Sequence, residues 1–341
     1  PDDGCHACRA VARRIAPQPD FNAITGLAGG GFVVAIGGET STSVAGAITT
    51  RRPRALVFDA RGAAIATIGG GDLPVDAPYH AGAVSLAALA GGGFALGTWT
   101  EPAVDGWRFR VQGFDAQGAP LGEPVEAWRA AEPFAGIVLG EVGGNVAVVI
   151  PVDGVQLRLV TPDGQLLRAA GSARVSDAYD VGAIGLGDRV AVSWSRYDAD
   201  TFQRHVELEQ FDTALQPLGE VIAIATGPDP VFDAHLARHD DGAAVFFLSG
   251  RDADGTRPIG YVLIDADGGA MGPIYVEQDD ADGCPYSLVG GFDAGGYAWA
   301  ALADGECRSP LRAWHAGATT QRLSPFDGAL HPDAVVYVEA L

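Results

Sequence analysis

The chain has 341 residues, of which 48 are Gly and 43 are Asp or Glu, and its formal net charge is −21. All 22 basic residues are Arg, because the sequence contains no Lys. Such acidity excludes nucleic acid as the expected partner, since neutralising phosphates requires a basic surface. No run of about 18 apolar residues occurs, so no membrane span is predicted.

The N-terminal segment, residues 1–17, is expected to form an arm outside the folded domain. Its start, "PDDGCHACRA", lacks the charged and apolar regions of a signal peptide. Cys5 and Cys8 in this arm do not form a c-type haem site, because Arg9 stands where the axial His is required. The four cysteines are an even number, which favours disulfides in an exported protein. We therefore expect a secreted, periplasmic or cell-surface protein.

One hairpin corner recurs along the rest of the chain. It reads "FDARGAAIATI" from Phe58, "FDAQGAPLGEP" from Phe114, "TPDGQLLRAA" from Thr161, "FDTALQPLGEV" from Phe211, "IDADGGAMGPI" from Ile264 and "WHAGATTQRL" from Trp314. Most copies combine an Asp that can bond its own backbone with small or Gly residues, which is the chemistry of a tight turn.

A second, Gly-rich corner lies upstream of each of these. It is followed by an alternating apolar run, as in "GGGFALGTWT" from Gly91, and preceded by a short apolar run, as in "AVSLAAL" from Ala83. The unit is thus four short strands that repeat about every 45 to 60 residues, a period typical of propeller blades. We predict an all-β fold over residues 18–324: a β-propeller of six four-stranded blades, with seven as the alternative.

These corners resemble those of bacterial secreted β-propeller repeat proteins, whose blades carry an "FDxxGxPLG"-like corner. The resemblance covers about residues 18–324 and implies the architecture alone. Only the first blade, with "VVAIGG" at residues 33–38 and "VFD" at residues 57–59, is weakly similar to kelch.

Residues 325–341 follow the sixth corner, and residues 334–341 read as a lone strand. Because an unpaired strand edge promotes aggregation, this strand must pair with something. We predict that it closes the ring within the chain, with residues 9–17 as the other unassigned strand-like stretch. The alternative is that a terminal segment adds to a neighbouring copy and forms a homo-oligomer.

The innermost strand of each blade is expected to begin on the rim that carries the loops between second and third strands. One position after the residue that opens each of these strands, the sequence has Asn22, His80, Ala135, Asp180, Asp233 and His331. Such a ring can bind a metal ion or polarise a carbonyl. The alternative is that these strand starts are polar because the channel contains water.

Two acidic residues on the same rim are the candidate calcium ligands. Asp252 and Asp254 lie in D-A-D-G, which resembles the start of a calcium loop, but Thr256 and Leu263 stand where further ligands are needed. An ordinary Asp-Gly turn accounts for the same D-A-D-G stretch. No cofactor is therefore expected, unless this loop binds Ca²⁺.

The main basic patch comprises Arg51, Arg52 and Arg54, in a long loop of the first blade. It is predicted to bind an anionic group or the acidic edge of a partner. The alternative is a solvated loop with no partner.

Cys284 and Cys307 are predicted to form a disulfide. Cys284 opens the first strand of the last full blade and Cys307 lies in its second-to-third loop, so both are expected on one rim. Such a bridge contributes about 3 kcal/mol in the loop-closure model. Cys5 and Cys8 are too close to constrain much chain, so they form either a local loop or a link to another chain.

No G-x-S-x-G elbow, H-E-x-x-H pair or phosphate loop occurs in the sequence. The sequence therefore favours a secreted, non-catalytic binding or scaffold propeller that contacts a protein or glycan through its polar rim. The alternative is a carbohydrate- or ester-active lyase or hydrolase at the channel mouth that uses His80, Asp180, Asp233 and His331. A second alternative is a subunit of an extracellular oligomer or filament.

Overall fold

The computed structural model describes most of the chain between residues 22 and 316. The described residues are 22–38, 40–42, 48–50, 52–70, 82–103, 105–173, 175, 178–227, 234–239, 242–248, 259–265, 269–270, 274–276, 285–292, 298–304 and 312–316. They form strands and turns with no α-helix, and hence contain no helix that is long and apolar enough to cross a membrane.

Five sheets have four antiparallel strands each, and in every one the strands follow each other in chain order from one edge to the other. Blade 1 contains β1 (Asn22–Gly26), β2 (Phe32–Ile36), β5 (Arg54–Phe58) and β6 (Ala64–Gly69). Blade 2 contains β7 (Val84–Ala88), β8 (Phe94–Ala103), β9 (Gly106–Phe114) and β10 (Val125–Ala130). Blade 3 contains β11 (Val138–Val142), β12 (Asn145–Ile150), β13 (Gln156–Val160) and β14 (Leu166–Ser172).

Blade 4 contains β15 (Ala178–Gly185), β16 (Arg189–Asp198), β17 (Gln203–Asp212) and β18 (Pro217–Gly227). Blade 5 contains β19 (Ala234–His239), β20 (Gly242–Leu248), β21 (Ile259–Ile264) and β22 (Ile274–Val276). A further sheet has three described strands, β23 (Pro285–Phe292), β24 (Ala298–Asp304) and β25 (Arg312–Ala316). A short ribbon, β3 (Thr40–Thr42) and β4 (Ile48–Thr50), is inserted between β2 and β5.

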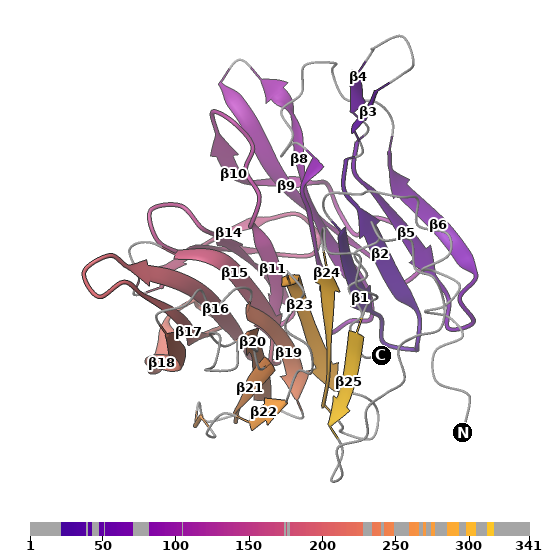
Figure 1. Ribbon diagram of the computed structural model, residues 1–341. Coiled ribbons are helices and arrows are strands. Elements are labelled where there is room, and N and C mark those ends of the chain that lie inside the picture. Colours follow the sequence, from indigo (N-terminus) through magenta and orange to yellow (C-terminus); the bar gives the residue numbers. More distant parts are fainter. Residues whose placement is uncertain are drawn as a thin grey trace.

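The first strand of each sheet is the innermost one. Contacts run from β1 to β7, and then in order to β11, β15, β19 and β23. Figure 1 shows β1, β11, β19 and β23 near the middle of the molecule, whereas β6, β10 and β18 lie at its periphery. This radial order of four-stranded antiparallel sheets is a β-propeller.

The all-β propeller prediction is therefore confirmed, and the predicted number of four-stranded blades is wrong. The described residues form five four-stranded blades, not six or seven, because the last sheet shows three strands in this part of the chain. The arm at residues 1–17 and the closing strand at residues 325–341 lie outside the described residues, so these domain boundaries and the ring closure stay predictions.

The recurring corner joins the third strand of a blade to the fourth. In blade 2, the Asp115 carboxylate accepts hydrogen bonds from the backbone N–H groups of Gln117 at 2.9 Å and Ala119 at 2.8 Å. Asp59 and Asp212 make the same pair of bonds in blades 1 and 4. In these three copies the Asp closes its own turn, as the sequence indicated, whereas in blade 3 the Thr161 hydroxyl accepts the corresponding bond from the N–H of Gln165.

The corner also requires a left-handed backbone conformation three residues after the Asp. Gly118 takes this position in blade 2, with a φ of 85°. Leu215 takes it in blade 4, with a φ of 56°, and its side chain is fully buried in the core between blades 3 and 4. The backbone strain of a non-Gly residue here is offset by this burial.

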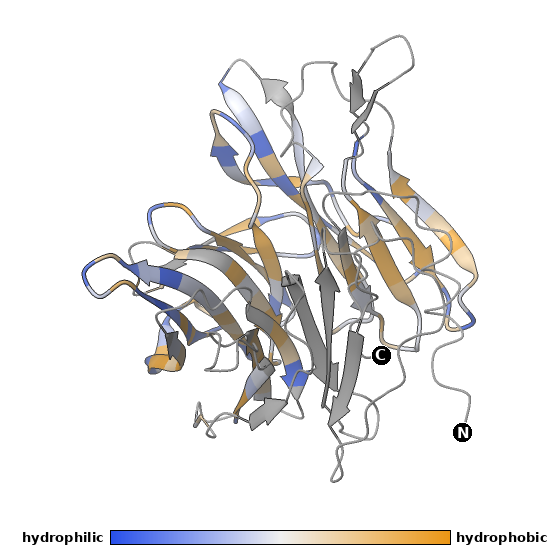
Figure 2. Cartoon of the chain, in the orientation of Figure 1, coloured by the Kyte–Doolittle hydropathy of each residue, from blue (hydrophilic) through white to orange (hydrophobic). Residues whose placement is uncertain are grey.

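The hydrophobic core is divided into layers that lie between neighbouring blades. Between blades 1 and 2, for example, Val33 and Val57 pack against Phe94 and Phe114, whose rings stack at 5.2 Å. Figure 2 shows the hydrophobic residues along the described strands and many hydrophilic ones toward the hairpin tips. No blade buries both of its faces alone, so the blades stabilise one another.

Backbone segments of neighbouring strands and blades approach closely at the corners. A Cβ atom at Gly93 would overlap the carbonyl oxygen of Phe114 on β9, and one at Gly31 would lie 2.6 Å from that of Phe58 on β5. Between blades, a Cβ atom at Gly118 would lie 2.9 Å from the Cβ of Ala66. The Gly-rich corners of the sequence are therefore explained by these approaches.

A buried carboxylate lies at the junction of blades 3 and 4. Glu141 on β11 is 9% exposed, and its Oε1 accepts a hydrogen bond of 2.6 Å from the N–H of Gly144. Burial raises the pKa of Glu141 above its ordinary value, and the Gly144 bond and the charge of Arg238 on β19 oppose this shift only in part. The folded protein therefore holds a proton on Glu141 more tightly than the unfolded chain does.

We predict that Gly118→Ala destabilises the protein by about 2 to 4 kcal/mol, because it adds a steric clash with blade 1 to the strain of a positive φ. Gly187→Ala is the matched control, since Gly187 has a φ of 79° and a Cβ atom added there would have nothing within 4 Å. Gly187→Ala should lower the free energy of unfolding by only about 1 kcal/mol. Urea unfolding measures both, and equal losses would show that blade contact at residue 118 is unimportant.

We predict that Glu141→Gln stabilises the protein at pH 8 and leaves its stability unchanged at pH 4. Because the folded-state pKa is raised, the contribution of Glu141 is fully present below its unfolded pKa and is lost as the pH rises through the folded pKa. Melting temperatures across this range measure the difference. Glu132→Gln, at an exposed carboxyl, is the control; a Glu141→Gln effect that did not vary with pH would contradict the prediction.

Candidate functional site

One end of the propeller, which we call the loop rim, carries the starts of the first strands and the loops between second and third strands. In the described residues it includes residues 103, 105 and 106 of the β8–β9 tip, the β12–β13 loop at residues 151–155 and the β16–β17 tip at residues 199–202. The recurring corners lie at the opposite end. This confirms the strand order from which the ring at the channel mouth was predicted.

Three members of the predicted ring fall on described residues. Asn22 is the first residue of β1, Asp180 is the third residue of β15, and Ala135 lies in the connection that leads into β11. Because β1, β7, β11, β15 and β19 are innermost neighbours in that order, their first residues lie on the same rim. His80, Asp233 and His331 lie outside the described residues, although Asp233 directly precedes β19 in the sequence.

The start of β15 contains an irregularity at Asp180. Tyr179 pairs with Ser195 and Gly182 pairs with Ser193, so two residues of β15 stand opposite the single residue Trp194. β-Bulges of this kind re-aim side chains and are frequent beside active sites. In the other four-stranded blades the first strand pairs regularly with the second, whereas β23 of the three-stranded sheet has a register shift of its own between Pro285 and Ser287.

Two serines flank this bulge on β16. Ser193 and Ser195 are fully buried, and neither hydroxyl has a hydrogen-bond partner among the residues that the structure describes. A Cβ atom at Gly182 would lie 2.8 Å from the Ser193 hydroxyl and 3.1 Å from Leu236 of β19, so these serines face blade 5. An unpaired buried hydroxyl lowers the folding stability by about 1 to 3 kcal/mol, so native proteins rarely keep one without a purpose.

The opposite face of the same strands holds a charged network. Glu207 on β17 accepts hydrogen bonds from the indole Nε1 of Trp194 at 3.0 Å and from Nε of Arg196 at 2.9 Å. The bond to Glu207 raises the pKa of Arg196, so this guanidinium stays charged. At the tip, hydrogen bonds from the Thr201 hydroxyl and from the N–H groups of Thr201 and Asp200 lower the pKa of Asp198. These contacts hold the β16–β17 hairpin in place at its tip on the loop rim.

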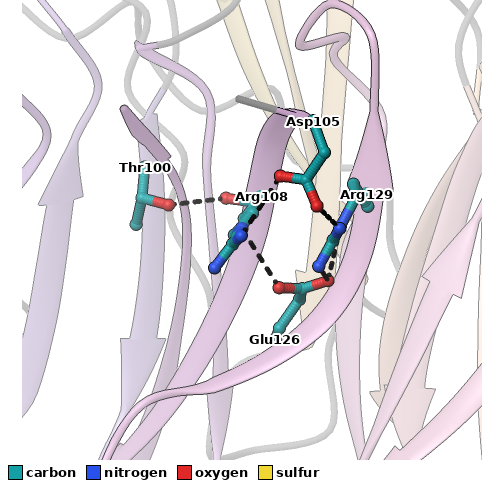
Figure 3. Close-up of polar contacts among 5 residues, drawn as sticks. All are labelled: Thr100, Asp105, Arg108, Glu126 and Arg129. Carbon is teal, nitrogen blue, oxygen red and sulfur yellow. Dashed lines mark hydrogen bonds and ion pairs between the residues drawn. The ribbon is translucent and has the colours of Figure 1, made fainter. Parts of the chain in front are cut away.

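A second charged cluster covers one face of blade 2 at the loop rim (Figure 3). Asp105 binds Nη2 of Arg108 at 3.2 Å and also pairs with Arg129. Glu126 lies 3.3 Å from Nε of Arg108 and 2.7 Å from Nη2 of Arg129. Two carboxylates and two guanidinium groups thus form a closed cycle across β9, β10 and the β8–β9 tip.

A bulge in β10 makes this cycle possible. Glu126 pairs with Arg110 and Arg129 pairs with Arg108, and the register shifts between Glu126 and Trp128. Without the extra residue, Ala127, side chains three positions apart would point to opposite faces. Instead Glu126 and Arg129 share the face that carries the charged cluster.

The basic patch of the first blade is only partly described. Arg52 is exposed and Arg54, the first residue of β5, is half-buried, whereas Arg51 lies outside the described residues. The structure does not bring Arg52 and Arg54 into the charged cluster of blade 2. Their role in binding an anionic partner stays a prediction.

The remaining predicted sites lie outside the described residues. This holds for the candidate calcium ligands Asp252 and Asp254 and for the cysteines Cys5, Cys8, Cys284 and Cys307. Within the described ranges, no group of three or more His, Cys, Asp or Glu side chains is arranged to hold a metal ion. The calcium and disulfide predictions are therefore untested.

Neither the two charged clusters nor the two serines were predicted from the sequence. The alternation of Arg108 and Arg110 along β9 was a signal for a charged strand face, since residues two apart share a face. The bulges in β10 and β15 left no comparable signal, because they depend on how neighbouring strands pair. The partners of Glu126 and the surroundings of Asp180 were for that reason not predictable.

No protein-family model matches the sequence, and no curated protein matches it. Among solved structures, an α-L-arabinanase of Penicillium chrysogenum is similar at 12% identity and a TM-score of 0.45, over 68% of this chain and 76% of that one. An endo-arabinase of Bacteroides thetaiotaomicron is similar at 13% identity and a TM-score of 0.38, over 69% and 91%. An acylaminoacyl peptidase of Pyrococcus horikoshii is similar at 9% identity and a TM-score of 0.46, over 91% and 53%.

These neighbours overturn the prediction of a non-catalytic binding or scaffold propeller. That prediction was based on the absence of short catalytic motifs, yet the three chains described above are named as enzymes, two of them as arabinan-degrading ones. At these identities and TM-scores, the likeness does not identify a substrate or a catalytic residue in this chain. What this protein does has to be inferred from its own loop rim.

Proposed function

We propose that the protein is a carbohydrate-active hydrolase whose site lies at the channel mouth on the loop rim. The observation that carries this proposal is the bulge of β15 at Asp180, flanked by the buried and unpaired hydroxyls of Ser193 and Ser195. It combines, at one strand start, a carboxyl-bearing residue with hydroxyl groups that need partners.

The unpaired serines support a ligand rich in hydroxyl groups. A serine hydroxyl both donates and accepts a hydrogen bond, and so does every hydroxyl of a sugar. A buried hydroxyl contributes more when a ligand or an ordered water satisfies it, because its desolvation is then compensated. Because Ser193 and Ser195 are fully buried between blades 4 and 5, an ordered water would link them to a polyhydroxylated substrate at this end of the interface.

The chemistry of glycosidic bond cleavage supports a pair of carboxyl groups at neighbouring strand starts. Most glycoside hydrolases use one carboxylic acid to protonate the leaving oxygen and a second carboxylate as nucleophile or base. In this proposal Asp180 and Asp233 form the pair, since β15 and β19 are neighbouring innermost strands. Asn22, together with His80 and His331, which the sequence predicts at other strand starts, then orients the sugar.

A secreted or cell-surface location belongs to the same proposal. A hydrolase meets polysaccharides outside the cell, and the predicted Cys284–Cys307 disulfide is stable in that oxidising environment. The strongly negative chain remains soluble there.

We predict that Asp180→Asn and Asp233→Asn each lower kcat/KM by about a hundredfold or more, because each removes an acid or base from the reaction. Reducing-sugar release from a panel of neutral and acidic polysaccharides measures the activity. Asp188→Asn is the matched control in blade 4, since the Asp188 side chain is 82% exposed at the opposite end of the propeller.

The melting temperature of each variant shows whether the fold is kept. A wild-type protein that cleaves no glycan of the panel would contradict the proposed function. Full activity of a folded Asp180→Asn protein would show that the catalytic pair lies elsewhere.

A further inference from the structure

The charged cluster of blade 2 leaves one guanidinium group without a counterion. Asp105 and Glu126 are both engaged by Arg108 and Arg129, as the closed cycle in Figure 3 shows. Arg110 lies directly opposite Glu126 in the register of β9 and β10. The carboxylate of Glu126 nevertheless turns to the two other arginines.

Arg110 makes no hydrogen bond or ion pair with the described residues. Its side chain is half-buried, and its Nε atom is buried without a hydrogen-bond partner. A partly desolvated guanidinium with an unused N–H group is costly unless an acceptor completes it. The cycle has no net charge, so Arg110 adds an uncompensated positive charge among the described side chains of this face.

Arg110 lies in the part of β9 that leads from the loop rim. Residues 108 and 110 lie in the half of β9 that is next to the β8–β9 tip, beyond the layer where Phe94 and Phe114 pack on blade 1. Thr98 of β8 stands opposite Arg110 in register and shares its face. A guanidinium group and a neighbouring hydroxyl therefore point to the same side of the sheet.

The chemistry of this pair fits a carboxylate. A guanidinium group presents parallel N–H donors that match the two oxygens of a carboxylate, and a threonine hydroxyl adds a third donor. The rest of the protein repels anions, because the chain has a net charge of −21. An anionic polymer therefore needs such a local cation in order to bind at all.

We propose that Arg110 and Thr98 form a subsite for the carboxylate of an acidic sugar residue, so that the substrate is a uronic-acid-containing glycan. The inference rests on the proposed function and names its substrate class. Arg108 and Arg129 act as the support of this subsite, because their pairing with Asp105 and Glu126 keeps both carboxylates away from Arg110.

Affinity electrophoresis in native gels tests the proposal. The gels contain polygalacturonate, a sulfated galactan or neutral arabinan, and the proteins are wild type, Arg110→Gln, Arg110→Lys and Arg189→Gln. Arg189 lies at the opposite end of blade 4 and pairs with Asp188, so Arg189→Gln removes the same charge far from the subsite. Melting temperatures confirm the fold of each variant.

We expect polygalacturonate to retard the wild type and the Arg189→Gln control equally. Arg110→Gln should weaken this binding by about tenfold, and Arg110→Lys should be intermediate, since Lys keeps the charge but not the paired donors. If Arg110→Gln does not fold, the difference in retardation by polygalacturonate between Arg110→Lys and the wild type tests the subsite instead.

Three results would overturn the inference: no retardation by polygalacturonate, equal retardation of the wild type and Arg110 variants, or retardation by the sulfated galactan alone. These are separable from failure of the proposed function. Cleavage of neutral arabinan that depends on Asp180, without binding of polygalacturonate, would uphold the hydrolase and reject the acidic-sugar subsite.

Discussion

The close approach of backbone segments at the corners is the constraint on which the propeller depends. The third Gly of "GGGF" precedes the second strand in blades 1 and 2, where a Cβ atom at Gly31 or Gly93 would strike the carbonyl that ends the third strand. Other glycines bring one blade onto the next, as Gly118 does on Ala66. A larger residue at such positions would separate the strands or blades and open the core layers between them.

Because the corners hold neighbouring blades together, the strands can differ in length toward the loop rim. β8, β9, β16 and β17 each have nine or ten residues, whereas β2 and β5 have five. The longer hairpins of blades 2 and 4 carry both charged clusters toward the rim. The polar groups that can meet a ligand are thus carried by the same strands whose other half forms the core.

Bulges determine which polar groups gather on the rim. The bulge in β10 gives Glu126 and Arg129 a common face and so completes the ion-pair cycle that leaves Arg110 without a counterion. The bulge in β15 interrupts the innermost strand at Asp180, between the register partners Ser193 and Ser195. In both blades one extra residue converts a regular strand face into a candidate binding surface.

The sequence by itself determined the strand order within a blade, the corner chemistry of Asp59, Asp115 and Asp212, and the rim on which Asn22 and Asp180 lie. These features follow from local periodicity and turn residues, which act over a few positions. The number of complete blades, the partners of Glu126 and the isolation of Arg110 were decided only by the tertiary structure. They depend on register, on bulges and on the packing of strands that are distant in sequence. In a strand, side chains three positions apart share a face only where pairing with another strand forces an extra residue into the ladder.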